Sequence, residues 1–459
     1  MQKVLVIIPH WDCETYAYCL DKAVEYQLKG YEVSIVDFSR FHSEIYRNWA
    51  LQIKNFVKFR NSTKRVYKEI VEKYGISEHF SKKSNFDSRV ILDESEQTYF
   101  HNILKSTLTK YTGDRYLNLN KVPREVYYHE LHLYLAVKNR VSKIISEFGI
   151  SLLITVNGRF VVDGAVARVA HESGSQLILL ERGRERIGGV EEFKISPQSL
   201  TEQRINQKKS WDNAGERKIQ SAKKGLELKR SGILESNWRS RFINVYQQSG
   251  DNNHKLAVFF PSTDLEFSPF EHIDQEFNVW SQVDAFKAFC EVTMSLGYKV
   301  IVRVHPVGDR RRKIGEFEDE LWTTLCRETG SDFISSFSSL DSYSLLNNAD
   351  LCATYSSSIG VDCLLLGKRT IVLGATSYSH LVPEHCAQSL KEIKTRMSEK
   401  LTLKNVELLL PWGYYYYLGG NSLRLFQVSP NNKLTFNGRE LNEVRKIWIR
   451  ATKVLKLPK

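Results

Sequence analysis

The feature that most constrains this chain is a pattern in which short, continuous apolar runs alternate with segments of helical periodicity. Near the N-terminus the run Val4–Ile8 is followed by a helical pattern over Cys13–Leu28 and a second run over Tyr31–Phe38. Further runs follow at Ser151–Val156 and Gln176–Leu180. Runs of this kind are typical of parallel strands buried on both faces, so the pattern predicts a doubly wound α/β sheet.

The same alternation starts again in the second half of the chain. Apolar runs occur at Lys255–Pro261, Lys299–Val304, Asp350–Thr354 and Thr370–Leu373, with a helical pattern over Ser281–Leu296 after the first of them. Because 459 residues are too many for one core, two α/β domains are expected. The predicted fold class is therefore α/β, with two Rossmann-like domains facing an interdomain cleft.

Changes in composition suggest where these domains begin and end. Residues 1–200 form the expected N-terminal domain, with a helical insertion over about 42–148. Residues 201–250 contain eleven Lys and Arg against five Asp and Glu, which predicts a solvated basic helical connector. Residues 251–405 form the C-terminal domain. Residues 406–459 contain the aromatic run Pro411–Tyr417 and a final basic helix over Leu441–Leu455, and we expect them to pack back on the N-terminal domain.

The bulk composition narrows the class of protein. With 42% hydrophobic and 26% charged residues, the chain is an ordinary globular one. Its net charge of +12 suits nucleic acid, an anionic membrane face or an anionic substrate, but no nucleic-acid-binding motif accompanies it, so nucleic acid is not an expected partner. Seven irregularly spaced cysteines and the lack of a long apolar run predict a cytoplasmic protein, with peripheral contact at the inner face of a membrane as a further option. No spacing suggests a metal site or a cofactor.

Two segments of the second half combine into a candidate phosphate site. Ser356, Ser357 and Ser358 lie between a predicted strand and a predicted helix, where backbone N–H groups and hydroxyls can bind a phosphate. Gly360 would let a ligand approach the backbone closely. A helix cap by one serine is the simpler alternative.

Arg303 and His305 alternate at the end of another predicted strand and so share one face. His305 can donate to a phosphate oxygen, while Arg303 could instead lie buried in an ion pair. Asp362 would repel a phosphate, so it should face uncharged groups such as ribose hydroxyls, unless it only balances the helix dipole.

Other polar residues follow predicted strand ends, where ligands of parallel sheets bind. Ser262, Asp264 and Glu266 are candidate contacts to a nucleotide or sugar, with turn residues as the alternative. On the N-terminal domain, Asn157 and Arg159 are candidate acceptor-side residues. A general base for sugar transfer would come from Glu181, His10 or Asp12. Two α/β domains with the phosphate chemistry in the second describe a glycosyltransferase of the GT-B type.

The stretch from Val258 to Leu381 resembles the bacterial capsule polysaccharide synthesis family, which includes Kdo-transferase-like GT-B enzymes. The matching motifs are Ser262–Phe267, Trp280–Gln282, Arg303–Pro306, Ser357–Asp362, Gly367–Lys368 and Leu373–Gly374 with Tyr378 beyond. Asn157-Gly158-Arg159 and Glu181-Arg182-Gly183 are similar to N-domain features of the same group. The family usually has Glu where this chain has Asp362, which leaves the ribose geometry open.

The resemblance implies a nucleotide-sugar donor, with CMP-Kdo or a related CMP-sugar favoured, and a cell-surface polysaccharide or its lipid-linked precursor as acceptor. No Asp-x-Asp motif accompanies the candidate site, and His, Arg and backbone donors could replace a metal, so the expected reaction is metal-independent. Two alternatives remain. Polyol-phosphate transferases that use CDP-glycerol or CDP-ribitol have a similar spacing of serines and Asp. A catalytically inactive assembly partner is the third possibility.

Overall fold

The computed structural model describes residues 2–10, 12–39, 54–79, 92–112, 118–183, 188–231, 246, 255–262, 280–306, 312–399, 401, 405–429 and 433–441. The chain divides into two compact units, each of which is described by itself. Unit 1 comprises residues 1–112, 116–197 and 418–459, and unit 2 comprises residues 113–115 and 198–417.

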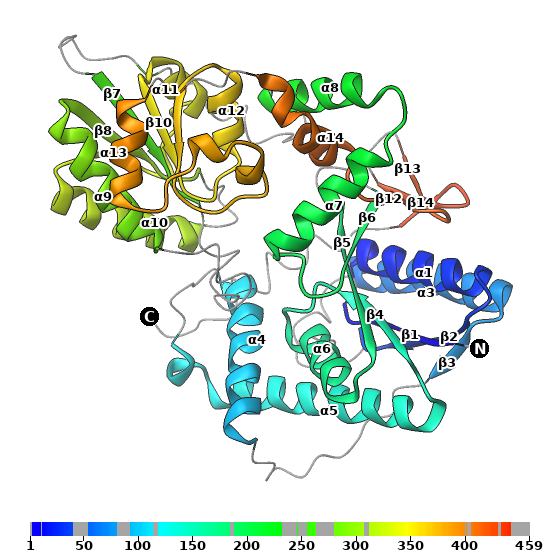
Figure 1. Ribbon diagram of the computed structural model, residues 1–459. Coiled ribbons are helices and arrows are strands. Elements are labelled where there is room, and N and C mark those ends of the chain that lie inside the picture. The colour runs from blue at the N-terminus through cyan, green and yellow to red at the C-terminus, as the bar shows by residue number, and fades with distance from the viewer. Residues whose placement is uncertain are drawn as a thin grey trace. The chain divides into compact units, whose positions relative to one another are not determined.

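Unit 1 is built on a seven-stranded sheet with the order β12-β6-β5-β4-β1-β2-β3 (Figure 1). Strands β1 to β5 are parallel, while β6 and β12 run antiparallel at one edge. The strands are β1 (Lys3–Ile8), β2 (Glu32–Asp37), β3 (Ser77–His79), β4 (Leu152–Val156), β5 (Gln176–Arg182), β6 (Gly189–Phe193) and β12 (Asn421–Ser422). The helices are α1 (Cys13–Leu28), α3 (Lys54–Tyr74), α4 (Glu94–Thr112), α5 (Arg124–Phe148) and α6 (Val161–Ser173), with a 3-10 turn at Leu119–Lys121.

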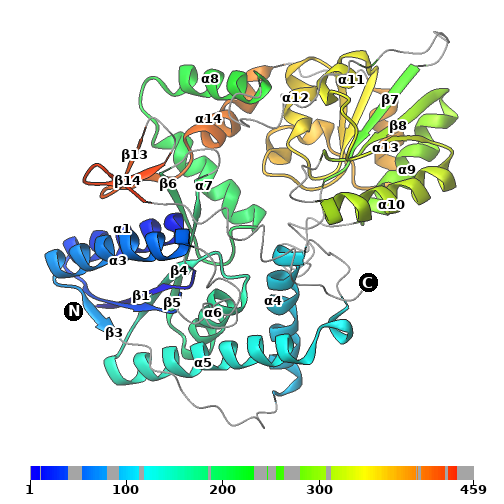
Figure 2. The same ribbon diagram turned by 180° about the vertical axis from the view of Figure 1, so that it is seen from behind.

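The side chains of β1 alternate between two cores. Val4 and Val6 pack with α1 and α3 on one face, and Leu5 and Ile7 pack with α4, α5 and α6 on the other. Both ribbon views show α1 and α3 over one side of the sheet and α5 and α6 over the opposite side (Figures 1 and 2). Burial on both faces explains why the predicted strand is a continuous apolar run.

The predicted insertion over about 42–148 is largely helical where it is described, through α3, α4 and α5. It also contains β3, which pairs in parallel with β2 and extends the sheet. This strand was not expected from the sequence. Its three residues are Ser, Glu and His, and an edge strand of that composition has no apolar periodicity.

The C-terminal part of the chain returns to unit 1. Besides β12, it forms a small antiparallel sheet from β13 (Gln427–Val428), β14 (Leu434–Phe436) and β15 (Arg439–Glu440). Phe426 and Phe436 join the core on the α1 face of the large sheet. The final helix predicted over Leu441–Leu455 lies almost entirely outside the described residues.

Unit 2 has a five-stranded parallel sheet with the order β11-β10-β7-β8-β9. Its strands are β7 (Lys255–Phe260), β8 (Tyr298–Arg303), β9 (Asp332–Ile334), β10 (Leu351–Thr354) and β11 (Arg369–Val372). Its helices are α7 (Leu200–Asp212), α8 (Lys218–Ser231), α9 (Gln282–Ser295), α10 (Arg312–Thr329), α11 (Ser342–Asn348), α12 (Ile359–Leu365), α13 (Leu390–Ser398) and α14 (Leu410–Leu418). Short 3-10 turns lie at Ser379–Leu381, Pro383–His385 and Val406–Leu409.

Helices cover both faces of this second sheet as well. Phe259 packs with α9 and α10 on one face, and Val258 lies in the core that includes residues of α11 and α12 on the other. Helices α8 and α14 form a further layer, because Ala222 and Leu226 pack with Val361 of α12 and Trp412 of α14. The segment 201–250 is thus helical in its described part, but α8 is packed rather than fully solvated.

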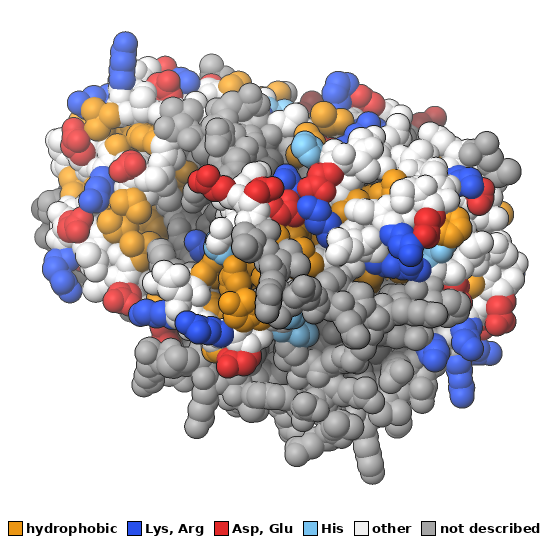
Figure 3. Space-filling view, turned by 90° about the horizontal axis from the view of Figure 1, so that it is seen from below, with side chains coloured by type: hydrophobic (Ala, Val, Ile, Leu, Met, Phe, Trp, Pro, Cys, Tyr) orange, Lys and Arg blue, Asp and Glu red, His pale blue; other side chains and the backbone are white. Residues whose placement is uncertain are grey.

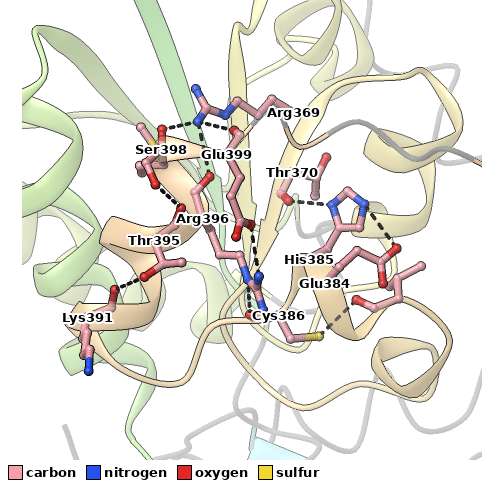
Figure 4. A network of polar contacts seen from close by, with 12 residues as sticks. Arg369, Thr370, Glu384, His385, Cys386, Lys391, Thr395, Arg396, Ser398 and Glu399 are labelled. Atoms are coloured by element: carbon pink, nitrogen blue, oxygen red, sulfur yellow. Dashed lines mark hydrogen bonds and ion pairs between the residues drawn. The ribbon is translucent and has the colours of Figure 1, made fainter.

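The side chain of Arg369 ties the edge strand β11 to the end of α13. Arg369 donates to the carbonyl oxygens of Arg396 at 3.2 Å and Glu399 at 2.9 Å, and also to that of Met397 (Figure 4). These carbonyls end a helix and have no intrahelical partner, so a guanidinium there both satisfies and charge-balances them.

In both units the first parallel strand lies inside the sheet, and the next strands of the chain are added on one side of it. The chain then returns to add strands on the other side, so the strand order reverses next to the first strand. In unit 1 this reversal falls between β1 and β4, and in unit 2 it falls between β7 and β10. The predicted α/β class with two Rossmann-like units is confirmed. Ligands of such sheets bind at the carboxyl ends of the strands beside this reversal.

Candidate active site

A pocket of about 90 Å³ lies at the carboxyl ends of β7, β8 and β10. These three strands are neighbours in the sheet of unit 2 and include the pair at which the strand order reverses. The pocket is lined by Lys229, Phe260, Pro261, Arg303, His305, Pro306, Ser342, Tyr343, Ser357, Ser358, Ile359 and Asp362. The structure therefore brings together five of the predicted donor-site residues: Arg303, His305, Ser357, Ser358 and Asp362.

Arg303, the last residue of β8, is 1% exposed. Its side chain hydrogen-bonds mainly to the segment between β9 and α11. Its guanidinium donates to the carbonyl oxygens of Ser335 at 2.7 Å and Leu340 at 3.1 Å, and to the hydroxyl of Ser342 at 3.1 Å. Burial lowers the pKa of Arg303 to about 10, so it remains a cation at neutral pH. It shapes one wall of the pocket and adds positive charge there.

His305 follows β8 by two residues and is exposed, unlike Arg303. It lines the pocket next to Pro306. An imidazole at a strand end can donate a hydrogen bond to a phosphate oxygen, or carry a positive charge when protonated. Among the described donor-site residues that line the pocket, His305 and Ser358 are the exposed ones.

The three serines differ in their surroundings. Ser356 adopts a left-handed backbone conformation with φ 48°, and its hydroxyl donates to the carbonyl oxygen of Ala375 at 2.9 Å. Ser357 and Ser358 line the pocket, and Ser358 precedes α12 without making a side-chain capping hydrogen bond. The hydroxyls of Ser357 and Ser358 are thus the ones placed to contact a ligand, while that of Ser356 holds the turn.

Gly360 is required by packing inside the protein. A Cβ atom at this position would lie 2.0 Å from the hydroxyl of Tyr378 and 2.9 Å from that of Thr354. Tyr378 is 1% exposed, and its hydroxyl donates to the carbonyl oxygen of Ser357 at 2.9 Å. Burial raises the pKa of Tyr378 well above its ordinary value. Tyr378 fills the space through which a ligand was predicted to approach Gly360, and it supports the serine turn.

Asp362 lies in α12, is fully buried, and forms an ion pair with Lys229 of α8. Both residues line the pocket. Lys229 was not singled out from the sequence, because it belongs to the segment interpreted as a solvated connector. The spacing of Ala222, Leu226 and Lys229 would have placed all three on one buried helix face.

The third predicted donor segment is only partly described. Ser262 is largely buried, and its backbone N–H donates to the Gln282 side chain at 2.9 Å. Ser262 does not line the pocket. Asp264 and Glu266 lie outside the described residues.

Polar residues also gather at the carboxyl ends of β1 and β4 in unit 1. His10 Nε2 lies 3.5 Å from Oδ1 of Asp163, which is fully buried in the first turn of α6. The other carboxylate oxygen of Asp163 accepts from the backbone N–H of Gly158 at 2.9 Å. A fixed carboxylate beside an imidazole is the arrangement that orients a histidine for proton transfer. Asp163 was not predicted as a site residue.

Asn157 and Glu181 are in contact at the ends of β4 and β5. Asn157 has φ 57°, and its amide donates to the carboxylate of Glu181, which also accepts from the backbone N–H of Arg182 at 3.2 Å. Arg159 lies over the ring of Phe160, 4.9 Å from its centroid. Two hydrogen bonds thus fix the position of the Glu181 carboxylate.

Asp12 caps helix α1. Its carboxylate accepts from the backbone N–H and the hydroxyl of Thr15, both at 2.7 Å. This is the ordinary role of Asp at a helix start. Of the three predicted bases, His10 therefore has the surroundings best suited to proton transfer.

Within the described residues, no group of three or more His, Cys, Asp or Glu side chains is placed to hold a metal ion. None of the described helices combines the length and apolarity needed to cross a bilayer. On the face shown in Figure 3, Lys and Arg side chains are interspersed with Asp and Glu among the described residues. That face supplies no observation in favour of the predicted contact with an anionic membrane.

No protein-family model and no curated protein matches this chain. Among solved structures, it is similar to the KpsC beta Kdo 2,4 transferase of Thermosulfurimonas dismutans, with 16% identity, a TM-score of 0.40, and coverage of 66% of this chain and 88% of the other. The beta Kdo 2,7 transferase of KpsC from the same organism gives 14% identity, a TM-score of 0.36, and coverage of 69% and 90%.

The UDP-GlcNAc 2-epimerase of Methanocaldococcus jannaschii, solved with UDP-GlcNAc and UDP, gives 12% identity, a TM-score of 0.28, and coverage of 88% and 93%. The two Kdo transferases carry the activity of the family that the sequence motifs resemble.

Proposed function

We propose that this chain is a glycosyltransferase that binds a nucleotide-sugar donor in the pocket of unit 2. One observation carries the proposal. His305 and the Ser357–Ser358 turn, far apart in the sequence, line the same pocket beside the strand reversal, where parallel sheets bind ligands. The departing phosphate gains negative charge as the sugar leaves, and donors fixed around it stabilise that charge.

The donor we favour is a CMP-sugar such as CMP-Kdo, because the His-Pro and Ser pairing resembles that of enzymes using CMP-sugars. The acceptor would be a cell-surface polysaccharide or its lipid-linked precursor. His305, Arg303 and the two hydroxyls supply the electrostatic stabilisation, so the proposed reaction needs no metal. In unit 1, His10 would take the proton of the acceptor hydroxyl, oriented by Asp163, with Asn157 and Arg159 on the acceptor side.

A nucleotide panel tests the donor site. We expect CMP to raise the thermal unfolding temperature of the full chain more than CDP, UDP or GDP do. His305→Ala should abolish the shift, because it removes the accessible imidazole of the pocket. His171→Ala is the matched control, since His171 is an exposed histidine in the last turn of α6. If none of these nucleotides shifts the unfolding temperature, the proposal is wrong.

Turnover tests the reaction. With the donor that the panel selects, His305→Ala and Ser357→Ala should each lower kcat by about 10²-fold or more, the scale of losing one charge-stabilising donor. EDTA should leave the wild-type rate unchanged. Wild-type rates in both variants would place the reaction elsewhere.

The runner-up is a polyol-phosphate transferase, which the spacing of Ser357, Ser358 and Asp362 favours. Turnover of CDP-glycerol or CDP-ribitol, without turnover of CMP-sugars, would decide for it. A chain that binds a nucleotide but transfers nothing from either donor class would fit the inactive assembly partner.

A further inference from the structure

The pocket of unit 2 contains a buried ion pair that spans two distant parts of the chain. Nζ of Lys229, on α8, contacts Oδ2 of Asp362, on α12. Lys229 is 1% exposed and Asp362 is fully buried, yet both line the pocket. Asp362 is the only Asp or Glu among the residues that line the pocket.

The pair is incompletely hydrogen-bonded. Oδ1 of Asp362, the oxygen that does not contact Lys229, is buried and has no hydrogen-bond partner among the described residues. A buried carboxylate oxygen without a donor destabilises the folded protein. A ligand that supplies an O–H or N–H group would satisfy it.

The opposite charges of Asp362 and Lys229 determine which ligand group can bind beside Oδ1 of Asp362. Asp362 alone would repel a phosphate bound near His305, but Lys229 cancels its charge at close range. Oδ1 can then accept a hydrogen bond from a neutral hydroxyl while the anionic part of the same ligand lies at His305 and the serine turn. A nucleotide has both parts, a phosphate and the hydroxyls of its ribose.

We propose that Lys229 is a positioning residue of the donor site, which fixes the Asp362 carboxylate so that Oδ1 accepts a hydrogen bond from a ribose hydroxyl. The inference rests on the proposed function, since it needs a nucleotide in this pocket. Lys229 thereby makes the site selective for ribonucleotides over nucleotides that lack ribose hydroxyls.

The packing of α8 holds Lys229 at the required depth. Gly225 lies against α14 so closely that a Cβ atom there would be 2.6 Å from the carbonyl oxygen of Gly413 and 2.6 Å from Cβ of Tyr417. Leu226, on the next position, packs in the same cluster as Val361 of α12. Lys229 follows one helical turn after Gly225, so the close contact between the two helices sets how far its ammonium group reaches.

The experiment compares binding of CMP with binding of 2′,3′-dideoxy-CMP to the full chain by calorimetry, or of the corresponding pair for whichever nucleotide the panel selects. The wild type should prefer the ribonucleotide by at least about tenfold, the scale of a hydrogen bond to a charged group. Lys229→Met should lose that preference. Lys223→Met and Lys224→Met, exposed on the same helix, should keep it.

A double variant, Lys229→Met with Asp362→Leu, separates positioning from stability. Replacing both partners of a buried ion pair with apolar residues is often neutral for stability. We expect this variant to unfold near the wild-type temperature and to bind both nucleotides equally. Recovery of the ribonucleotide preference in the double variant would overturn the inference, because the pair would then be only structural.

The two proposals fail in different ways. If a nucleotide binds but the wild type and Lys229→Met show the same preference, the role of Lys229 is wrong and the donor site stands. If no nucleotide binds to the wild type, the donor site itself is wrong, and the inference falls with it.

Discussion

Asp21 accepts a hydrogen bond at 2.8 Å from the backbone N–H of Leu425, which lies 404 residues further along the chain. The same carboxylate oxygen accepts from the backbone N–H of Arg424 at 2.7 Å. Asp21 lies on the buried side of α1. Through the Asp21 side chain, α1 binds the C-terminal segment around Arg424 and Leu425. Burial raises the pKa of Asp21, although the two N–H groups oppose that shift.

Asp21→Ala should therefore destabilise unit 1. The change leaves two backbone N–H groups without an acceptor, and we expect a loss of about 2 kcal/mol or more in the free energy of unfolding. Limited proteolysis should then cut the chain faster around residues 421–429. Asp21→Asn is the control, because its amide oxygen can still accept. Equal stability of the Ala and Asn variants would show that these hydrogen bonds do not hold the segment.

Gly360→Ala should disturb the serine turn through Tyr378. The added methyl group would clash with the Tyr378 hydroxyl, and overpacking of this kind costs about 1–3 kcal/mol. Tyr378→Phe removes the clashing oxygen and should recover part of the stability lost in Gly360→Ala. Gly215→Ala is the matched control, because no atom lies within 4 Å of the added group. Chemical denaturation of the wild type, the two single variants and the double variant gives the coupling between positions 360 and 378.

Glu130 should make unit 1 less stable as the pH rises. Burial raises the pKa of Glu130 to about 7 from its ordinary 4.5. Between these two values the folded protein binds a proton that the unfolded chain releases, so the free energy of unfolding falls as pH increases through this window. The loss is complete above pH 7 and amounts to about 3 kcal/mol.

Glu130→Gln should remove this pH dependence, since an amide does not titrate. Urea denaturation of both proteins from pH 4 to pH 8 measures it, and Glu125→Gln, on the exposed side of the same helix, should behave as the wild type does. Parallel curves for Glu130→Gln and the wild type would mean that Glu130 has the same pKa in the folded protein and in the unfolded chain.

His10→Ala should lower kcat by about 10²-fold or more if His10 is the general base. Asp163→Asn should lower it less, because the amide keeps an acceptor but loses the charge beside His10. The thermal shift with CMP should stay unchanged in both variants, since the proposed donor pocket belongs to unit 2. A full loss of kcat in Glu181→Gln together with a normal rate in His10→Ala would instead identify Glu181 as the base.

Helices and strands whose ends or burial are marked by the local sequence were predicted at the right place. Helix α1 begins and ends where its pattern indicated, at Cys13 and Leu28, because Asp12 caps its start and Lys29-Gly30 follows its end. The strands that precede His10, His305 and Ser356 are buried on both faces, so their apolar runs were visible. Placing polar residues at their ends then followed from the geometry of parallel sheets.

Features that depend on tertiary contacts were missed. Lys229 pairs with a residue 133 positions away, and no local pattern marks that partner. Gly360 suggested an open approach for a ligand, but the hydroxyl of Tyr378 occupies the space. Strand β3 is defined by its parallel pairing with β2, which the sequence of β3 does not indicate. In each of these cases the sequence does not show which distant part of the chain contacts the residue or strand.

Unit 1 is discontinuous, whereas almost all of unit 2 is the single stretch 198–417. On the ribosome the N-terminal part of a chain emerges first. Strand β12, which completes the edge of the unit 1 sheet beside β6, is therefore made only after the whole of that stretch. Unit 2 can therefore fold before β12, the last strand of the unit 1 sheet, has been synthesised. A gene fragment for residues 198–417 can thus encode a nearly whole unit, but no single uninterrupted fragment can encode unit 1 alone.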